Sequence, residues 1–176
     1  YKAGTKEQKA EYLTKLTSGE WIGCWSLTEP EAGSDAGGTR TLAVQDGTDW
    51  ILNGSKTFTT NVHYADLCVG MAMTDRSQSH HGISAFLVPK DTPGYKPGKK
   101  ENKLGLRANC RVPDSQMLGK RGEGFVDSLR ILDGGRVSIA ALSIGMAQGA
   151  YDAALKYAKL RKQFGRPISE FQAIQH

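Results

Sequence analysis

Residues 39–60, TRTLAVQDGTDWILNGSKTFTT, decide the fold that this sequence predicts. Two runs of alternating apolar and polar residues stand on either side of Asp46-Gly47. A period of two is typical of strands with one buried face, and Asp-Gly is a strong signal for a two-residue hairpin turn. We therefore predict a β-hairpin here, with Asn53-Gly54 as a second turn into the segment SKTFTT.

Segments on both sides of the hairpin also have strand character. They are EWIGCWSL (20–27), ADLCVGMAMT (65–74) and GISAFLV (82–88), and the polar segment DRSQSHH (75–81) joins the last two. Several short strands at this spacing favour an antiparallel barrel or sandwich. We interpret His80-His81 as an exposed hairpin tip rather than as metal ligands, and we predict no metal site.

Helical patterns flank this β-region. Residues 5–17 have an apolar face and Thr5 as a capping residue. Apolar residues recur at helical spacing after about residue 121, with Gly134-Gly135 interrupting the pattern at a cost of about 1 kcal/mol per glycine. The segment GRP (165–167) ends this helix, and ISEFQAIQH (168–176) begins another.

The predicted fold class is therefore α+β, with an antiparallel β-barrel or sandwich domain between an N-terminal helix and a partial C-terminal helical domain. We place the domain boundaries at residues 1–20, 21–120 and 121–176. The unfinished last helix suggests that the chain is a fragment of a longer protein.

Composition and charge exclude some functional classes. The 176 residues carry a net charge of +5, a mild excess that permits an anionic small ligand but does not indicate nucleic-acid binding. Four lysines cluster without interleaved aromatic residues, and we interpret them as a solvated loop: Lys96, Lys99, Lys100 and Lys103. No apolar run approaches the length of a membrane span, which takes roughly 18 residues.

The three cysteines, Cys24, Cys68 and Cys110, are widely spaced and form no CxxC motif. We interpret them as small buried apolar residues of a protein that functions in a reducing compartment.

Residues 27–35, LTEPEAGSD, are too dense in hydroxyls, carboxylates and turn residues to lie inside a helix or a central strand. Their composition fits a solvated turn and fits a binding loop equally well.

Five strings in order resemble the acyl-CoA dehydrogenase family, and its short-chain (butyryl-type) branch in particular. They are LTEPEAGSD (27–35), LNGSKTFTTN (52–61), LGLR (104–107), LDGGR (132–136) and RKQFGRPISEFQ (161–172). The resemblance implies an FAD enzyme that desaturates an acyl-CoA thioester between its α and β carbons and passes electrons to an electron-transfer flavoprotein. It also implies a homotetramer, a dimer of dimers, in the bacterial cytoplasm or the mitochondrial matrix.

The resemblance assigns site residues by position. Trp25, Leu27 and Thr28 would lie along the flavin ring, and Gly33 and Ser34 would meet phosphates of the cofactor or of CoA. Phe58 takes the place of the family's tryptophan, Thr59 replaces an aliphatic residue, and the Thr60 hydroxyl would reach flavin N5. Without the resemblance, Phe58 and Thr60 fit alternate positions of an ordinary strand equally well.

Downstream residues complete the implied site. Asp133, Gly135 and Arg136 match positions at the CoA moiety, although Asp133 and Arg136 also fit a surface ion pair at i, i+3. A further group matches the string through which one subunit reaches the FAD of its neighbour: Arg161, Gln163, Phe164 and Gln172. The alternative is that the basic residues complement the dipole of a helix end.

The catalytic base is the main gap. The family's glutamate lies either far along the C-terminal domain or, in some branches, at the position of Gly135. We therefore expect it beyond His176, and we expect Glu29 to brace its loop rather than to act as a base. The family also has a strand between the positions of Arg107 and Val112 that this sequence lacks. Its absence predicts either that the β-domain is truncated at one edge or that a loop has been closed up in the numbering.

Two other functions stay open at this point. In the first, the chain is a non-catalytic module that binds flavin or associates with another chain, because it lacks a base. Alternatively, the same fold would pass its electrons to oxygen, as in acyl-CoA oxidases.

Overall fold

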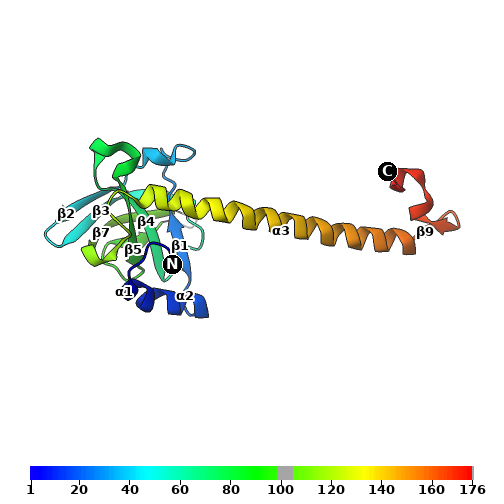
Figure 1. Ribbon diagram of the computed structural model, residues 1–176, viewed down its shortest axis with the longest axis horizontal. Helices are drawn as coiled ribbons and strands as arrows, with labels where there is room; N and C mark the ends of the chain where they lie inside the picture. The colour runs from blue at the N-terminus through cyan, green and yellow to red at the C-terminus, as the bar shows by residue number, and fades with distance from the viewer. Residues whose placement is uncertain (99–104, 176) are drawn as a thin grey trace. The chain divides into compact units, whose positions relative to one another are not determined.

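The computed structural model describes residues 1–98 and 105–175, without the side chains of residues 105–109 (Figure 1). The chain forms two compact units, residues 1–129 and 130–176. Of the predicted lysine loop and the LGLR string, Lys99, Lys100, Lys103 and Leu104 lie outside the described residues.

The first unit begins with a short helical segment. It consists of α1 (Lys6–Gln8), the π-helical turn η1 (Lys9–Leu13) and α2 (Thr14–Ser18). Thr5 caps it as predicted: its hydroxyl accepts from the Gln8 N–H at 3.2 Å, and the Gln8 side chain accepts from the Thr5 N–H at 3.1 Å. This reciprocal capping box satisfies two N–H groups that the first turn leaves unpaired.

Eight strands form one sheet in the order β6-β7-β3-β2-β4-β5-β8, with β1 paired to β4. Most neighbours are antiparallel, as the predicted fold class requires, but β1 runs parallel to β4 and β2 makes one parallel contact with β4. The sheet is therefore mixed rather than purely antiparallel. The strands are β1 (Gly23–Ser26), β2 (Leu42–Asp46), β3 (Asp49–Thr57), β4 (Leu67–Met73), β5 (Ile83–Pro89), β6 (Tyr95–Pro97), β7 (Gly105–Pro113) and β8 (Met117–Leu118).

The predicted hairpin is confirmed, with its turn one residue later than predicted: Asp46 of β2 pairs with Asp49 of β3, so Gly47 and Thr48 form the turn. The second predicted turn, at Asn53-Gly54, is wrong, because β3 continues through both residues. A Cβ atom on Gly54 would lie 2.7 Å from the Cα of Thr41, so this position needs glycine for close approach of two backbones.

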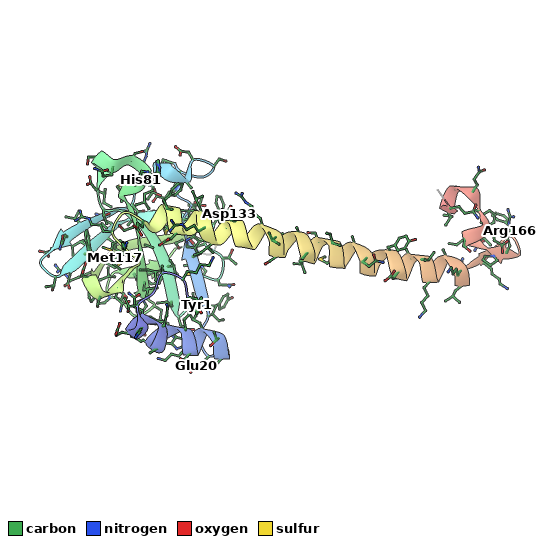
Figure 2. The ribbon with its side chains drawn as sticks, in the orientation of Figure 1. Tyr1, Glu20, His81, Met117, Asp133 and Arg166 are labelled. Atoms are coloured by element: carbon green, nitrogen blue, oxygen red, sulfur yellow. The ribbon has the colours of Figure 1, made fainter. Side chains whose placement is uncertain are left out.

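Three short 3-10 segments connect the strands: η2 (Ala36–Gly38), η3 (Arg76–Gly82) and η4 (Asp114–Gln116). His80 and His81 lie on η3 between β4 and β5, and both are exposed (Figure 2). The predicted tip position is therefore confirmed. Among the described residues, no group of three potential metal ligands comes together.

Strand β7 covers the region between Arg107 and Val112, where we expected a strand of the family to be absent. It pairs with β3 along all nine residues, and its segment 106–108 pairs with β6 on the other side. The chain therefore continues directly from the LGLR string into the strand that ends at Pro113. Over residues 106–108 the structure does not form the unpaired edge that we considered.

Buried apolar side chains fill the first unit between its strands. Among the side chains that are at most 2% exposed, the largest are Trp50 on β3, Phe86 on β5 and Met71 on β4. The rings of Trp50 and Phe86 pack with centroids 5.7 Å apart. All three cysteines are buried as predicted and carry free thiols.

Helix α3 (Gly124–Leu160) runs without a break through Gly134 and Gly135, in agreement with the helix predicted after residue 121. A Cβ built on either glycine meets no described atom within 4 Å. The second unit then has a hairpin of β9 (Lys162–Gln163) and β10 (Arg166–Pro167), the turn η5 (Ile168–Glu170) and α4 (Gln172–Gln175). The last helix therefore begins four residues later than predicted. Within the described part of the chain, no helix has the length and apolar character needed to cross a membrane.

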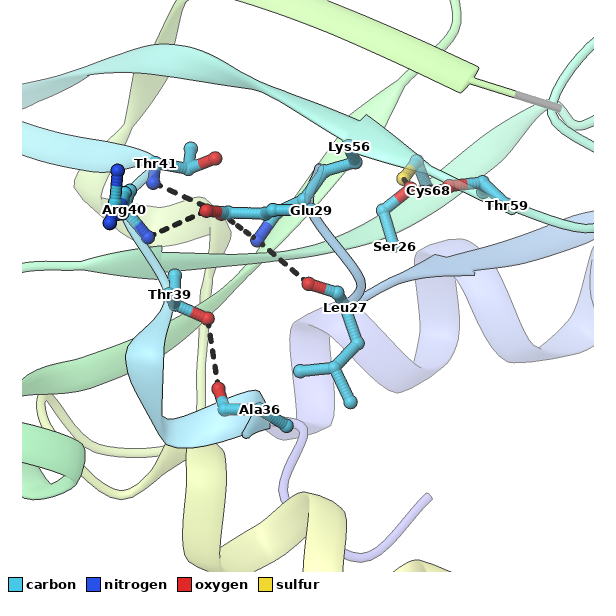
Figure 3. A network of polar contacts seen from close by, with 10 residues as sticks. All are labelled: Ser26, Leu27, Glu29, Ala36, Thr39, Arg40, Thr41, Lys56, Thr59 and Cys68. Atoms are coloured by element: carbon cyan, nitrogen blue, oxygen red, sulfur yellow. Dashed lines mark hydrogen bonds and ion pairs between the residues drawn. The ribbon is translucent and has the colours of Figure 1, made fainter. Parts of the chain in front are cut away.

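A buried ion pair fixes the loop after β1 (Figure 3). The Glu29 carboxylate accepts from Lys56 Nζ at 2.7 Å, and the two side chains are 2% and 4% exposed. It also accepts from the backbone N–H groups of Arg40 at 2.6 Å and Thr41 at 3.0 Å. Lys56 Nζ donates a second bond to the Leu27 carbonyl at 3.1 Å. Glu29 therefore braces its loop, as the sequence predicted.

The electrostatic balance keeps Glu29 ionised. Burial raises the pKa of this carboxyl, but the hydrogen bonds from Lys56 and Thr41 outweigh burial, so the pKa lies below its usual value. Burial lowers the pKa of Lys56, and Glu29 offsets part of that effect. Each charge is therefore tolerated in the core only because the other is present.

Replacing Glu29 by glutamine should destabilise the protein by about 3–5 kcal/mol, because Lys56 would stay buried without a counter-charge. Urea unfolding of the full-length protein measures this change. The matched control is Asp46→Asn, which removes one carboxylate from the exposed pairs of Arg111 and leaves the turn residues Gly47 and Thr48 unchanged. The control should cost at most about 1 kcal/mol. Equal losses in both variants would contradict the role given to the buried pair.

The acid dependence of stability should also change in Glu29→Gln. Because the folded-state pKa of Glu29 is depressed, its contribution is fully present above the unfolded value of about 4.3 and is lost as pH falls through the folded value. The free energy of unfolding of the variant should therefore fall less steeply below about pH 4.5 than that of the wild type. Parallel acid slopes in the two proteins would show that Glu29 titrates as in the unfolded chain.

Candidate functional site

One hollow of about 340 Å³ lies in the first unit where β1 and β3 end. Two segments far apart in the sequence form its wall. The first is the start of β1 with the two residues that follow the strand, and the second runs from the last residue of β3 to Asn61. The lining residues are Gly23, Cys24, Trp25, Leu27, Thr28, Thr57, Phe58, Thr60 and Asn61. The structure thus brings together five predicted cofactor contacts: Trp25, Leu27, Thr28, Phe58 and Thr60.

The chain after β3 has an unusual backbone. The strand ends at Thr57, and both Phe58 (φ 55°) and Asn61 (φ 66°) adopt left-handed conformations. The Asn61 carbonyl accepts from the N–H groups of Tyr64 and Ala65, each at 2.8 Å, which closes the turn. Phe58 and Thr60 are therefore not alternate residues of an ordinary strand. Left-handed non-glycine residues cost of order 1–3 kcal/mol and gather at functional sites.

The two wall segments are joined by one backbone hydrogen bond, from the Thr57 N–H to the Thr28 carbonyl at 2.8 Å. Trp25 and Phe58 remain 39% and 57% exposed, which is unusual for large aromatic side chains. The Thr57 hydroxyl is buried and has no hydrogen-bond partner among the described residues. Aromatic surface with nearby hydroxyls suits a flat heteroaromatic ring that has one polar edge.

Thr59 lies behind this wall rather than in it. It is 1% exposed, and its hydroxyl lies 2.8 Å from the Ser26 hydroxyl, itself fully buried (Figure 3). Ser26 Oγ also lies 3.4 Å from Cys68 Sγ. Sequence reasoning missed Ser26 because a single serine in a strand gives no signal. It also missed Asn61, although asparagine tolerates left-handed backbone better than most residues.

Gly33 and Ser34 follow the turn in which Glu29 and Ala32 exchange backbone hydrogen bonds at 2.9 and 3.2 Å. Both residues are exposed, and neither lines the hollow. Space beside Gly33 is open, because a Cβ there would meet no described atom within 4 Å.

The remaining predicted residues lie in the second unit. Asp133 and Arg136 form the simple i, i+3 ion pair at 3.5 Å, with both side chains more than 70% exposed, and Gly135 between them is also exposed. Phe164 is 92% exposed at the tip of the β9–β10 hairpin, with φ 51°. The three other predicted residues lie nearby in the sequence: Arg161 precedes β9, Gln163 lies in β9, and Gln172 begins α4.

Comparisons with known proteins agree with these observations. The pattern of the family described as "Acyl-CoA dehydrogenase, middle domain" matches residues 24–112, and that of "Acyl-CoA dehydrogenase, C-terminal domain" matches residues 122–176. The short-chain specific acyl-CoA dehydrogenase of Rattus norvegicus mitochondria is 46% identical, over 99% of this chain and 44% of its own length. That alignment runs over 183 residues, so some residues of the rat protein have no counterpart among the 176 here.

Solved structures resemble the chain equally well. Butyryl-CoA dehydrogenase from Megasphaera elsdenii has a TM-score of 0.91 and 41% identity, over 99% of this chain and 48% of that one. A structure described under "Electron transferring flavoprotein of Acidaminococcus fermentans" has a TM-score of 0.92 and 49% identity, with the same coverage. A glutaryl-CoA dehydrogenase from Mycobacterium smegmatis in complex with FADH2 has a TM-score of 0.88 and 37% identity, over 99% and 46%.

The chain thus spans about half the length of the proteins that it matches. The two family patterns cover its β-region and the helix that comes after it. This chain belongs to the acyl-CoA dehydrogenase family.

Proposed function

We propose that this chain forms the flavin-contacting part of an FAD-dependent enzyme that dehydrogenates a short-chain acyl-CoA thioester between its α and β carbons. The observation that carries the proposal is the single hollow in which Trp25, Leu27 and Thr28 meet Phe58 and Thr60. The similarity to short-chain and butyryl-CoA dehydrogenases supports the substrate class.

The hollow has the groups that a flavin ring requires. FAD, when bound, supplies an acceptor for two electrons and for the hydrogen that leaves the β carbon. Trp25 and Phe58 offer apolar surface that excludes water from the ring, and the Thr28 and Thr60 hydroxyls orient its polar edge. The unpartnered hydroxyl of Thr57 is a further candidate for this edge, although the sequence did not indicate it.

Other parts of the chain complete the proposed site. Gly33 and Ser34 form an exposed bend suited to phosphate, because glycine lets backbone N–H groups approach an anion. Asp133, Gly135 and Arg136 would contact the CoA moiety from α3. The exposed hairpin tip at Phe164, together with Arg161, Gln163 and Gln172, would contact the FAD of a neighbouring subunit.

The proposed base is a carboxylate outside these 176 residues. Glu29 is the acidic residue nearest to the wall in sequence, but its two oxygens already accept hydrogen bonds from Lys56, Arg40 and Thr41. Its depressed pKa makes it a weak proton acceptor. Glu29 therefore positions the loop, and proton abstraction falls to another residue.

Assembly and partners belong to the same proposal. Helix α3 exposes several large apolar side chains by more than half: Val137, Ile139, Leu142, Ile144 and Met146. Since these residues lie on opposite sides of the helix, both sides favour burial against further helices or another subunit, as in a dimer of dimers. We propose that the domains are residues 1–20, 21–120 and 121–176. We also propose an electron-transfer flavoprotein as the electron acceptor, which the similarity to the Acidaminococcus structure supports.

The full-length protein should therefore purify with bound FAD, and butyryl-CoA should bleach its absorbance in the visible flavin band under anaerobic conditions. The 176-residue chain should give no turnover, because it lacks the base. A full-length protein that binds no FAD would overturn the proposal. Rapid reoxidation of the reduced protein by oxygen would instead identify an oxidase.

Substitutions in the wall should separate its two functions. Phe58→Ala should weaken FAD retention about tenfold through loss of stacking surface, and Phe58→Trp should restore it. Thr60→Ala should slow flavin reduction about tenfold while FAD remains bound, since one hydrogen bond is worth roughly 1 kcal/mol. Val44→Ala is the matched control, because Val44 is 56% exposed on β2, outside the hollow. FAD titration and stopped-flow reduction measure both effects, and a change in the control equal to that in Phe58→Ala would remove the wall from the proposal.

A further inference from the structure

Two buried thiols lie side by side next to the hollow, one of them in its lining. Cys24 on β1 and Cys68 on β4 are direct partners in the parallel register of these strands. They are 8% and 1% exposed, and both belong to the same core cluster, so their side chains lie on the same face of the sheet. The two residues are far apart in the sequence, and only the parallel placement of β1 brings them together.

The strand geometry suits a covalent link between them. Neighbouring strands lie about 4.8 Å apart, and a disulfide joins Cα atoms that are about 4.4–6.8 Å apart. Both thiols are free, and each affects the pKa of the other. Cys110 lies in the same core, but the residue opposite it on β3 is Leu52, so no thiol faces Cys110 in this strand pair.

The surroundings of the pair favour chemistry at the sulfur atoms. Cys68 Sγ lies 3.4 Å from the Ser26 hydroxyl, and Cys24 Sγ lies 4.0 Å from the Tyr95 hydroxyl. The neighbouring Cys68, together with burial, raises the pKa of Cys24, whereas the proximity of Cys24 and Ser26 lowers the pKa of Cys68. Cys68 is therefore the better nucleophile of the two.

Access to the pair comes from the hollow itself. Cys24 is one of the nine residues that line it, between Gly23 and Trp25. A small polar oxidant that enters the hollow therefore reaches Cys24. Only a local opening of the structure is then needed for the oxidant to meet Cys68.

We propose that Cys24 and Cys68 are a site of reversible oxidation by hydroperoxides, which join β1 to β4 through a disulfide. The Cys68 thiolate attacks one peroxide oxygen, the O–O bond breaks, and hydrogen peroxide leaves water and a sulfenic acid on Cys68. The Cys24 thiol then attacks that sulfur, the S–O bond breaks, and a second water leaves. Two thiols are oxidised by two electrons, the peroxide is reduced to two waters, and a dithiol reverses the change by exchange.

The bond would act on the wall of the hollow. Trp25 comes after Cys24 on β1 and pairs with Val69, which comes after Cys68 on β4. A disulfide one residue earlier would hold the two strands together directly beside this aromatic residue. The inference stands apart from the proposed function, because it concerns thiols of the apoprotein core and needs no flavin.

Peptide mapping of the full-length protein tests the proposal. The reduced protein is treated with a slight molar excess of hydrogen peroxide, alkylated, and digested without reductant for mass spectrometry. The expected product is a linked pair of peptides containing Cys24 and Cys68, which dithiothreitol separates. Recovery of both residues as alkylated thiols, oxidation of Cys68 without a link, or a link to Cys110 would each overturn the proposal.

Variants add a second measurement. The linked product should survive in Cys110→Ser, the matched control, and disappear in Cys24→Ser and Cys68→Ser. Oxidation should also raise the Tm of the wild type and of the control by about 5 °C or more, because the link restricts the unfolded chain. The wild-type peptide map decides the question even where a serine variant fails to fold. If the wild-type protein carries the link but its Tm is unchanged, the expectation that the disulfide fixes β1 to β4 is refuted.

Discussion

The ion pair between Glu29 and Lys56 is the interaction on which the rest of the first unit depends. Its two members flank the two wall segments of the hollow, since Glu29 comes directly after Thr28 and Lys56 precedes Thr57. Lys56 also binds the Leu27 carbonyl, and the next residue, Thr57, donates to the Thr28 carbonyl. One buried charge pair thus sets the spacing of the two segments. Stability and site geometry are therefore not separable here, because a change in the pair alters both.

The wall is built on polar contacts where most β-domains have only apolar packing. Behind it, Ser26 and Thr59 share a buried hydrogen bond, and Cys68 lies beside them. Beyond β3, Phe58 and Asn61 accept left-handed backbone that their side chains disfavour. Hydrogen bonds have direction, whereas apolar contacts do not, so such a network selects one arrangement of the wall from many of similar compactness. The strain at Phe58 is sustained by the surrounding bonds and orients the ring outward.

Local signals predicted much of the fold. The β2–β3 hairpin, the Thr5 cap and the strands around residue 70 depend on patterns within a few residues, and all are confirmed. Asn53-Gly54 carries an equally strong local turn signal, but Gly54 serves a contact with Thr41 on the neighbouring stretch of chain. Gly134 and Gly135 interrupt the apolar pattern but not the helix, which continues through both. Parallel pairing of β1 with β4 has no local signature, so the sequence suggested a purely antiparallel sheet.

The candidate site shows the same division between local and long-range information. Resemblance to the family located both wall segments, yet it could not show that Thr59 turns inward to meet Ser26, because that contact joins residues far apart in the sequence. The parallel pairing of β1 with β4 places Cys24 opposite Cys68, where neither residue type nor spacing suggested a pair. Residues of β1 alternate between exposed and buried positions, so Trp25 faces outward while its neighbours Cys24 and Ser26 are buried. A change in the core sulfur atoms would therefore act directly on the strand that carries the aromatic wall, because Trp25 is the next residue along it.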